Sequence, residues 1–281
     1  MVVFFHAVLV ASGMGVAGTP DAEYVSEREA LVRDASESTL KAWEAGSDWR
    51  KRVTALDVRA WQYDQSVAAA AWTIEPTATR VPAKRFMDPR LETPSAAGPL
   101  LARLTWGGEP VDVRVALVEA LVRTGGDWSP VVLSMLPEET DVSTRSMMVQ
   151  VARRAPPANA VSIVRLGFAD KAAPVRAAAA ETCPWVEGHE VLDAMVVTAL
   201  ADTDPGVRAE AARSAGWMEI DGSWAPIVKL LADADAGVRL QALRALQRLD
   251  PADTAELPEV EVLKHDKDLK VQRAATEAAP E

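Results

Sequence analysis

Residues 204–212 read DPGVRAEAA, and residues 235–243 repeat the same pattern as DAGVRLQAL. Shorter or weaker copies stand at 110–114 (PVDVR), 141–145 (DVSTR), 172–179 (AAPVRAAA) and 268–275 (DLKVQRAA). One arginine marks each of the first five copies at intervals of 31, 31, 32 and 31 residues: Arg114, Arg145, Arg176, Arg208 and Arg239. In the last copy Gln272 takes the arginine position. A period this constant indicates a repeat protein.

Each copy predicts two helices. Asp204 is a favoured N-cap, Pro205 suits the first helical position, and the apolar residues that follow recur at helical spacing. Gly216 is expected to end or loosen this first helix, and Ile227 to Leu231 then form a second apolar stripe. The other copies predict second helices near 129–136, 160–169, 190–200 and 257–264.

The period also extends towards the N-terminus. Arg52, in the segment Asp48 to Arg52, lies 62 residues before Arg114, which is two periods. The unit between them keeps an apolar second half at 98–104, whereas Pro82, Pro89 and Pro94 would interrupt a helix in its first half. Residues 19–46 are predicted to form an amphipathic helical cap.

A unit of about 31 residues cannot bury two apolar helix faces alone, so neighbouring units must stack. The prediction is therefore an all-α fold, an α-α superhelix or solenoid of about seven helical hairpins over residues 47–281. Such an array presents a long surface instead of one deep pocket.

The pattern Asp-x-x-Val-Arg-x-x-Ala-x-x-Ala resembles HEAT repeats, in particular the short repeats of phycobilisome-lyase-like proteins. The resemblance covers about residues 48–279. It implies a helical solenoid, and it implies little about activity because HEAT arrays serve many roles.

Charge is distributed unevenly along the chain. The net charge is −11; residues 1–104 carry 12 Lys and Arg against 13 Asp and Glu, so residues 105–281 carry 18 against 28. Nucleic-acid affinity depends on basic side chains, and this excess of acid therefore argues against a nucleic-acid partner. The single cysteine cannot form an internal disulfide.

Residues 1–18 have the features of a secretory signal. An apolar stretch, MVVFFHAVLV, precedes small residues at which a signal peptidase could cut near Ala17 or Gly18. The segment contains no Lys or Arg, which leaves open an apolar leader on a cytoplasmic protein. We expect export, a mature chain from about Thr19 and no transmembrane span.

The repeated arginines have two interpretations, an anion-binding row or a structural ladder between repeats. We favour the ladder, which the HEAT resemblance also implies, and assign to it Arg52, Arg114, Arg145, Arg176, Arg208, Arg239, Asp204 and Asp235. Acidic pairs such as Asp202/Asp204 and Asp233/Asp235 occupy equivalent turns. Within each pair we expect the first aspartate to accept from an arginine and the second to cap a helix. Calcium would need more oxygen ligands than these turns offer, so we expect no metal.

Residues that could support catalysis are few. His189-Glu190 resembles the pair of deoxyhypusine hydroxylase, a HEAT-like di-iron enzyme, but the pair occurs once here, and we interpret His189 as a residue at a helix start. Cys183 is expected to be a buried core residue. We expect no catalytic residues and no cofactor.

The nine tryptophans fall at repeated positions. Trp61, Trp185 and Trp217 share a position near the ends of first helices, and Trp128 and Trp224 share one at the starts of second helices, which favours packing. The alternative is that Trp106, Trp128 or Trp224 projects from the array as a binding anchor.

Residues 75–99 depart most from the repeat. They contain five prolines and a basic cluster of Arg80, Lys84, Arg85 and Arg90 around Phe86. The segment is either a solvated connector or a place where a partner is selected.

The sequence thus predicts a monomeric, non-catalytic scaffold that binds a protein partner. A groove lined by second helices and flanked by acidic residues would favour a basic or amphipathic segment. Two alternatives are a tetrapyrrole-handling role resembling bilin lyases and a glycosylase-like array acting on DNA.

Overall fold

The computed structural model describes residues 30–72, 89–105, 109–126 and 128–277. Every regular element in these ranges is a helix and none is a strand, which confirms the all-α prediction. The predicted signal segment 1–18 and most of the 75–99 segment lie outside the described residues. Nowhere in these ranges is a helix both long enough and apolar enough to cross a bilayer. The chain divides into two compact units, Met1–Thr124 and Gly125–Glu281.

The first unit packs its helices in chain order. α3 packs on α4, and α6 packs on α4 and on α7. Leu31, Val32, Leu40 and Trp43 from the predicted cap cover Ala55 and Val58 of α4. The elements are α3 (Glu37–Ala45), α4 (Trp49–Tyr63), α5 (Gln65–Ala71), η2 (Pro89–Leu91), η3 (Pro94–Ala96), α6 (Ala97–Thr105) and α7 (Val111–Leu121).

The prolines and one glycine explain the irregular part of this unit. Pro89 and Pro94 each begin a short 3-10 helix instead of a long α-helix. Gly98 then lets α6 approach α4, because a Cβ at this position would collide with the backbone of Leu56 and Asp57. The close contact needs a residue without a side chain.

The second unit is a stack of helical pairs. Its first helices are α9 (Val142–Gln150), α11 (Ala173–Thr182), α13 (Pro205–Met218), α15 (Ala236–Leu249) and α18 (Leu269–Glu277). Its second helices are α8 (Ser129–Met135), α10 (Pro157–Phe168), α12 (Asp193–Ala199), α14 (Trp224–Leu230) and α17 (Pro258–Leu263). The remaining elements are η4 (Val151–Arg154), η5 (Cys183–Trp185), η6 (His189–Leu192) and α16 (Pro251–Ala255).

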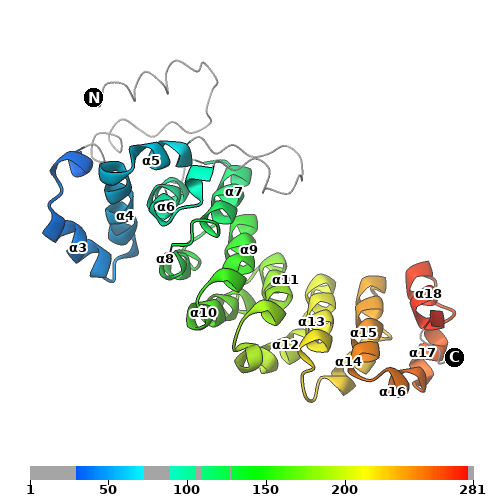
Figure 1. Ribbon diagram of the computed structural model, residues 1–281. Coiled ribbons are helices and arrows are strands. Elements are labelled where there is room, and N and C mark those ends of the chain that lie inside the picture. The colour runs from blue at the N-terminus through cyan, green and yellow to red at the C-terminus, as the bar shows by residue number, and fades with distance from the viewer. Residues whose placement is uncertain (1–29, 73–88, 106–108, 127, 278–281) are drawn as a thin grey trace, which may run out of the picture. The chain divides into compact units, whose positions relative to one another are not determined.

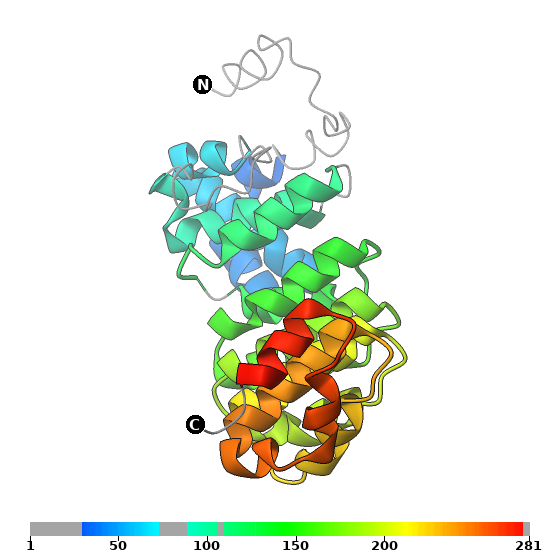
Figure 2. The same cartoon turned by 90° about the vertical axis from the view of Figure 1, so that its right-hand side faces the viewer.

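The first helices lie side by side in chain order, from α9 to α18 (Figure 1). Figure 2 views the stack from its α18 end, with α15 directly behind. The predicted second helices are found within a few residues of their expected positions. Valines and alanines of the first helices, among them Val207, Ala211 and Ala215, are fully buried between repeats. The repeat period therefore corresponds to one layer of this stack.

Aspartates begin several of the first helices, as predicted. The Asp204 carboxylate accepts hydrogen bonds from the backbone N–H groups of Gly206 (2.8 Å) and Val207 (3.2 Å). Asp235 accepts one from Val238 at 3.1 Å. These bonds satisfy N–H groups that have no partner within the helix.

Gly216 does not end α13, which corrects the prediction. The helix continues to Met218, and Gly216 is the point at which α13 meets α15. A Cβ on Gly216 would lie 2.7 Å from Cα of Ala245. The glycine is required by contact with the next repeat, which local sequence does not show.

We therefore expect Gly216→Ala to destabilise the protein. Alanine favours a helix by about 1 kcal/mol over glycine, whereas overpacking a closed contact costs about 1–3 kcal/mol. The urea unfolding midpoint should fall. A raised midpoint would show that helix propensity outweighs the contact with Ala245.

Candidate functional site

Four of the repeated arginines form one kind of contact in the second unit. Arg208 donates from Nε and Nη2 to the two carboxylate oxygens of Asp233, at 2.8 and 2.9 Å. Its Nη1 donates to the backbone carbonyls of Asp202 (2.9 Å) and Thr203 (3.1 Å). The same arrangement occurs in the pairs Arg145–Asp170, Arg176–Asp202 and Arg239–Asp266. We call these four pairs the ladder.

Each ladder aspartate also holds the turn on which it lies. Asp233 accepts a hydrogen bond from the backbone N–H of Asp235 at 2.9 Å, and Asp202 accepts one from Asp204 at 2.9 Å. Asp204 and Asp235 cap helices, which confirms the predicted division of roles within each acidic pair. The first aspartate of each pair is the acceptor.

The electrostatics of the ladder are those of a structural contact. Hydrogen bonds from the partner arginine hold the pKa of Asp202, Asp233 and Asp266 below the usual range, against the opposing effect of burial. Arg208 and Asp233 expose only 16% and 9% of their side chains. Four of the five N–H groups of Arg208 are used within the protein, which leaves little for an external anion.

The other two arginines predicted for the ladder, Arg52 and Arg114, lie in the first unit. Arg52 donates to the backbone carbonyl of Gly46 at 3.4 Å, which corresponds to the bond that ladder arginines make to their own turn. Arg114 is half-buried on α7.

A second column lies at the opposite end of the first helices, nine residues after each ladder arginine. Its members are exposed: Arg154, Trp185, Trp217 and Arg248. α13 has 14 residues, so Arg208 and Trp217 lie near opposite ends of a helix about 21 Å long. We call these four residues the edge column. The surface formed by the C-terminal ends of the first helices and the turns that follow them is called the turn edge.

The exposure of two tryptophans corrects the sequence prediction. Trp185 is 57% exposed and Trp217 is 50% exposed, although their shared position favoured packing. The guanidinium carbon of Arg248 lies 3.5 Å from the centroid of the Trp217 ring. One face of Trp217 therefore holds a cation already, as tryptophan faces favour.

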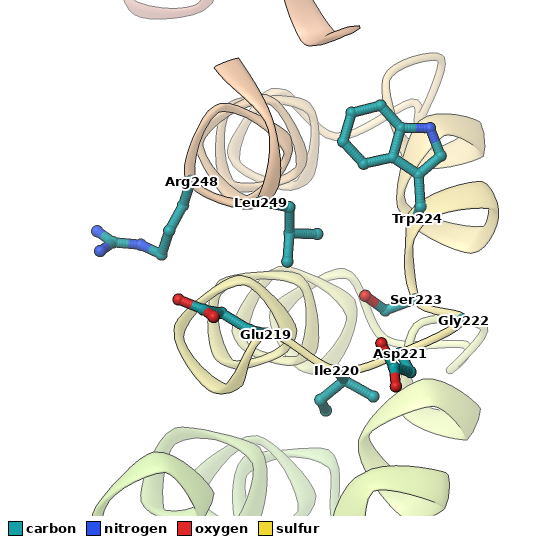
Figure 3. A pocket seen from close by; sticks show the side chains of 8 residues that line it. All are labelled: Glu219, Ile220, Asp221, Gly222, Ser223, Trp224, Arg248 and Leu249. Carbon is teal, nitrogen blue, oxygen red and sulfur yellow. The ribbon is translucent and has the colours of Figure 1, made fainter. Parts of the chain in front are cut away.

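A hollow of about 350 Å³ opens on the turn edge beside Arg248 (Figure 3). We call it the Ser223 hollow, and its lining residues are Glu219, Ile220, Asp221, Gly222, Ser223, Trp224, Arg248 and Leu249. It forms because α13 ends in a left-handed turn at Glu219 (φ 50°) and the chain turns again at Gly222 (φ 79°) before α14. Trp224, a predicted anchor, is half-buried in this wall.

Ser223 is fully buried, and its hydroxyl has no hydrogen-bond partner. It precedes α14 without capping it. Other buried serines are paired: Ser214 donates to the carbonyl of Ala180 at 2.7 Å, and Ser129 accepts from the Asn159 amide at 2.9 Å. A buried polar group without a hydrogen-bond partner is uncommon in proteins, and Ser223 is such a group.

Acidic side chains gather near this hollow. Burial raises the pKa of Asp193; His189 opposes the shift, and the negative charges of Glu190 and Asp221 add to it. Four of these acids form no salt bridge with any residue that the structure describes: Glu190, Asp193, Glu219 and Asp221. The turn edge thus carries unpaired negative charge, unlike the ladder.

A second hollow of about 380 Å³ lies on the same edge, lined by Gly125, Gly126, Trp128, Ser129, Arg154, Ala155 and Pro156. Trp128 is only 4% exposed, which confirms the packing favoured for it and rules out the alternative that it projects as an anchor. Arg90 is exposed on η2. The other predicted binding residues lie outside the described ranges: Arg80, Lys84, Arg85, Phe86 and Trp106.

Cys183 and His189 offer little to catalysis. Cys183 is buried, as predicted, and burial together with Asp193 raises the pKa of its thiol to about 12. His189 begins the short helix η6. Over the described ranges, no group of three His, Cys, Asp or Glu side chains is placed to hold a metal ion.

Comparison with known families identifies repeats in the C-terminal part of the chain. A family model described as HEAT repeats matches residues 192–279. No curated protein sequence matches the chain. Similar solved structures include one titled as an engineered protein, with 16% identity, a TM-score of 0.43 and coverage of 90% of this chain and 94% of that one. YibA of Escherichia coli has 15% identity, a TM-score of 0.39 and coverage of 93% and 97%. Another engineered protein has 18% identity, a TM-score of 0.42 and coverage of 94% and 71%.

The ladder predicts a large loss of stability in Arg208→Ala. The substitution leaves the carboxylate of Asp233 largely buried without its arginine, which costs about 2–3 kcal/mol. The melting temperature should fall by about 4–12 °C for a protein of this size. Arg244→Ala, at an exposed position of α15, is the control and should change stability by less than about 0.5 kcal/mol. Equal melting temperatures for the two variants would contradict the ladder.

The ladder also predicts how stability depends on pH. Because the folded-state pKa of Asp202, Asp233 and Asp266 is lowered, their stabilising contribution is present above the unfolded value of about 3.9 and is lost as pH falls through the lower folded values. The urea concentration at the unfolding midpoint should therefore decrease when the pH is lowered below about 4. The Asp233→Asn variant should be less stable at pH 7 and should lose less stability on acidification than the unchanged protein. If both proteins lose the same stability on acidification, this explanation is wrong.

Proposed function

Since residues 192–279 consist of HEAT repeats, we propose that this chain is a non-catalytic scaffold that binds a protein partner along its turn edge. The observation that carries the proposal is the pair of exposed tryptophans, Trp185 and Trp217, at equivalent positions of successive repeats. Tryptophan is enriched among residues that dominate binding energy at protein interfaces. Two such side chains on neighbouring layers provide anchors at a fixed spacing.

The ladder supports the proposal because it makes the anchors rigid. Each first helix is held at its start by contacts with the neighbouring turns, and Trp217 projects from the far end of such a helix. A surface that does not have to be ordered on binding loses less entropy when a partner docks.

We place the partner at the turn edge instead of in a groove of second helices. The exposed positions of α12 and α14 carry small or flexible side chains, such as Ala194, Thr198, Ala225 and Lys229. These side chains offer little area for contact. The turn edge combines aromatic rings with unpaired carboxylates, which suits a basic or amphipathic segment.

The other two candidate functions draw no specific support. A DNA-binding array would need cationic side chains to neutralise phosphates, whereas Glu219, Asp221 and Asp193 are unpaired acids on the turn edge. No feature of the described residues points specifically to a tetrapyrrole.

Peptide binding tests the proposal. An array of 15-residue peptides, rich or poor in lysine and arginine, would be probed with the full chain at 50 and 300 mM NaCl. We expect binding to basic and aromatic-basic peptides that weakens at the higher salt, because the contacts are partly electrostatic. The double variant Trp185→Ala/Trp217→Ala should lose most of this binding.

Tyr63→Ala is the matched control, since Tyr63 is an aromatic residue that is 75% exposed in the other unit. It should bind as the unchanged protein does. If the double variant binds every peptide normally, the turn edge is not the interface. If binding is independent of salt, the electrostatic part of the proposal is wrong.

A further inference from the structure

The Ser223 hollow contains a hydroxyl group that has no hydrogen-bond partner. The Ser223 hydroxyl is buried and unpaired, and it points into the hollow on the side of Leu249 (Figure 3). Leaving a buried hydroxyl without a partner is energetically unfavourable. A ligand that offers an N–H group at this point would supply the missing partner.

The walls and the mouth of the hollow differ in character. Trp224, Leu249 and Ile220 provide apolar walls. Glu219 and Asp221, both exposed, add carboxylates that have no salt-bridge partner among the described residues. In Figure 3 the Asp221 carboxylate lies on the side of Ser223, and that of Glu219 lies on the side of Arg248. Apolar walls beside an anionic group match the long stem and charged head of a basic side chain.

Arg248 lines the hollow but directs its charge elsewhere. Its guanidinium lies over the ring of Trp217, and in Figure 3 it points away from Trp224 and Ser223. The cation therefore leaves the space between Trp224 and Ser223 open. The same contact shows that Trp217 on this edge holds a guanidinium, and the exposed ring of Trp185 has no stacked cation among the described residues.

We propose that the Ser223 hollow receives a lysine or arginine side chain from a basic segment of the partner protein. The stem of that side chain lies between Trp224 and Leu249, and its N–H groups donate to the Ser223 hydroxyl and to the carboxylate of Asp221, while the charge of Glu219 adds to the attraction. The segment continues along the turn edge across Trp217 and Trp185. This inference rests on the proposed function and names the chemistry of the partner.

An anionic ligand fits the hollow less well. Phosphate or a carboxylate could bond to the Ser223 hydroxyl, but it would lie beside Glu219 and Asp221, whose charges repel it. The negative charges of Glu190 and Asp193, one repeat earlier, add to this repulsion. The local charge therefore favours a cation.

The test uses two fluorescent peptides, acetyl-(Ala-Lys-Ala-Leu)₃-amide and the same peptide with glutamine at each lysine position. Their binding to the full chain is measured by fluorescence anisotropy. We expect the lysine peptide to bind at least about tenfold more tightly than the glutamine peptide, which corresponds to about 1.4 kcal/mol. Asp221→Asn should weaken lysine-peptide binding about fivefold. Glu256→Gln, which removes one exposed carboxylate elsewhere, should change it less than twofold.

Ser223→Ala separates binding from folding. Because the free protein leaves this hydroxyl unpaired, its removal should leave the urea midpoint unchanged or raise it, while peptide affinity falls about threefold or more. Unchanged affinity in both Ser223→Ala and Asp221→Asn overturns the inference. If Trp185→Ala/Trp217→Ala still abolishes binding in that case, the proposed function stands without this hollow. If the unchanged protein binds neither peptide nor any array peptide, both proposals fail.

Discussion

The bidentate pair between an arginine of one repeat and an aspartate of the following turn is the contact on which the array depends. Arg208 joins its own turn, through the carbonyls of Asp202 and Thr203, to the next turn through Asp233. Asp233 in turn orders the start of α15 by accepting from the backbone of Asp235. Because the geometry of a guanidinium and a carboxylate is specific, the pair sets the position of one layer on the next as well as stabilising it.

The same constraint explains why the two ends of the first helices differ in character. At the starts of the first helices, acids and bases neutralise one another, and their hydrogen-bonding groups are largely used. At the ends of the same helices, Trp185 and Trp217 are exposed and Asp221 has no cationic partner among the described residues. One edge therefore maintains the array, and the other carries the unpaired charge and the aromatic area on which the proposed partner would bind.

The site could be predicted from the sequence only in part. Repeated positions favoured packing for Trp128, Trp185 and Trp217 alike, yet the structure buries only Trp128 and exposes the other two. Position in a repeat shows that side chains share an environment, but it does not show whether the neighbouring layer covers them. The offset of nine residues from each ladder arginine was a signal that could have grouped Arg154 and Arg248 with these tryptophans.

The sequence by itself determined the layered helical fold. The patterns that predict it are local: a period of 31 or 32 residues, N-cap aspartates and one arginine in each repeat. Their roles follow directly from hydrogen bonding within one turn or between adjacent repeats. Only the tertiary structure decided that Gly216 is a contact point with Ala245, that Ser223 is buried without a partner, and that Arg248 lies on Trp217. These features depend on the distances between side chains about one repeat apart or on the path of a turn, which no local pattern specifies.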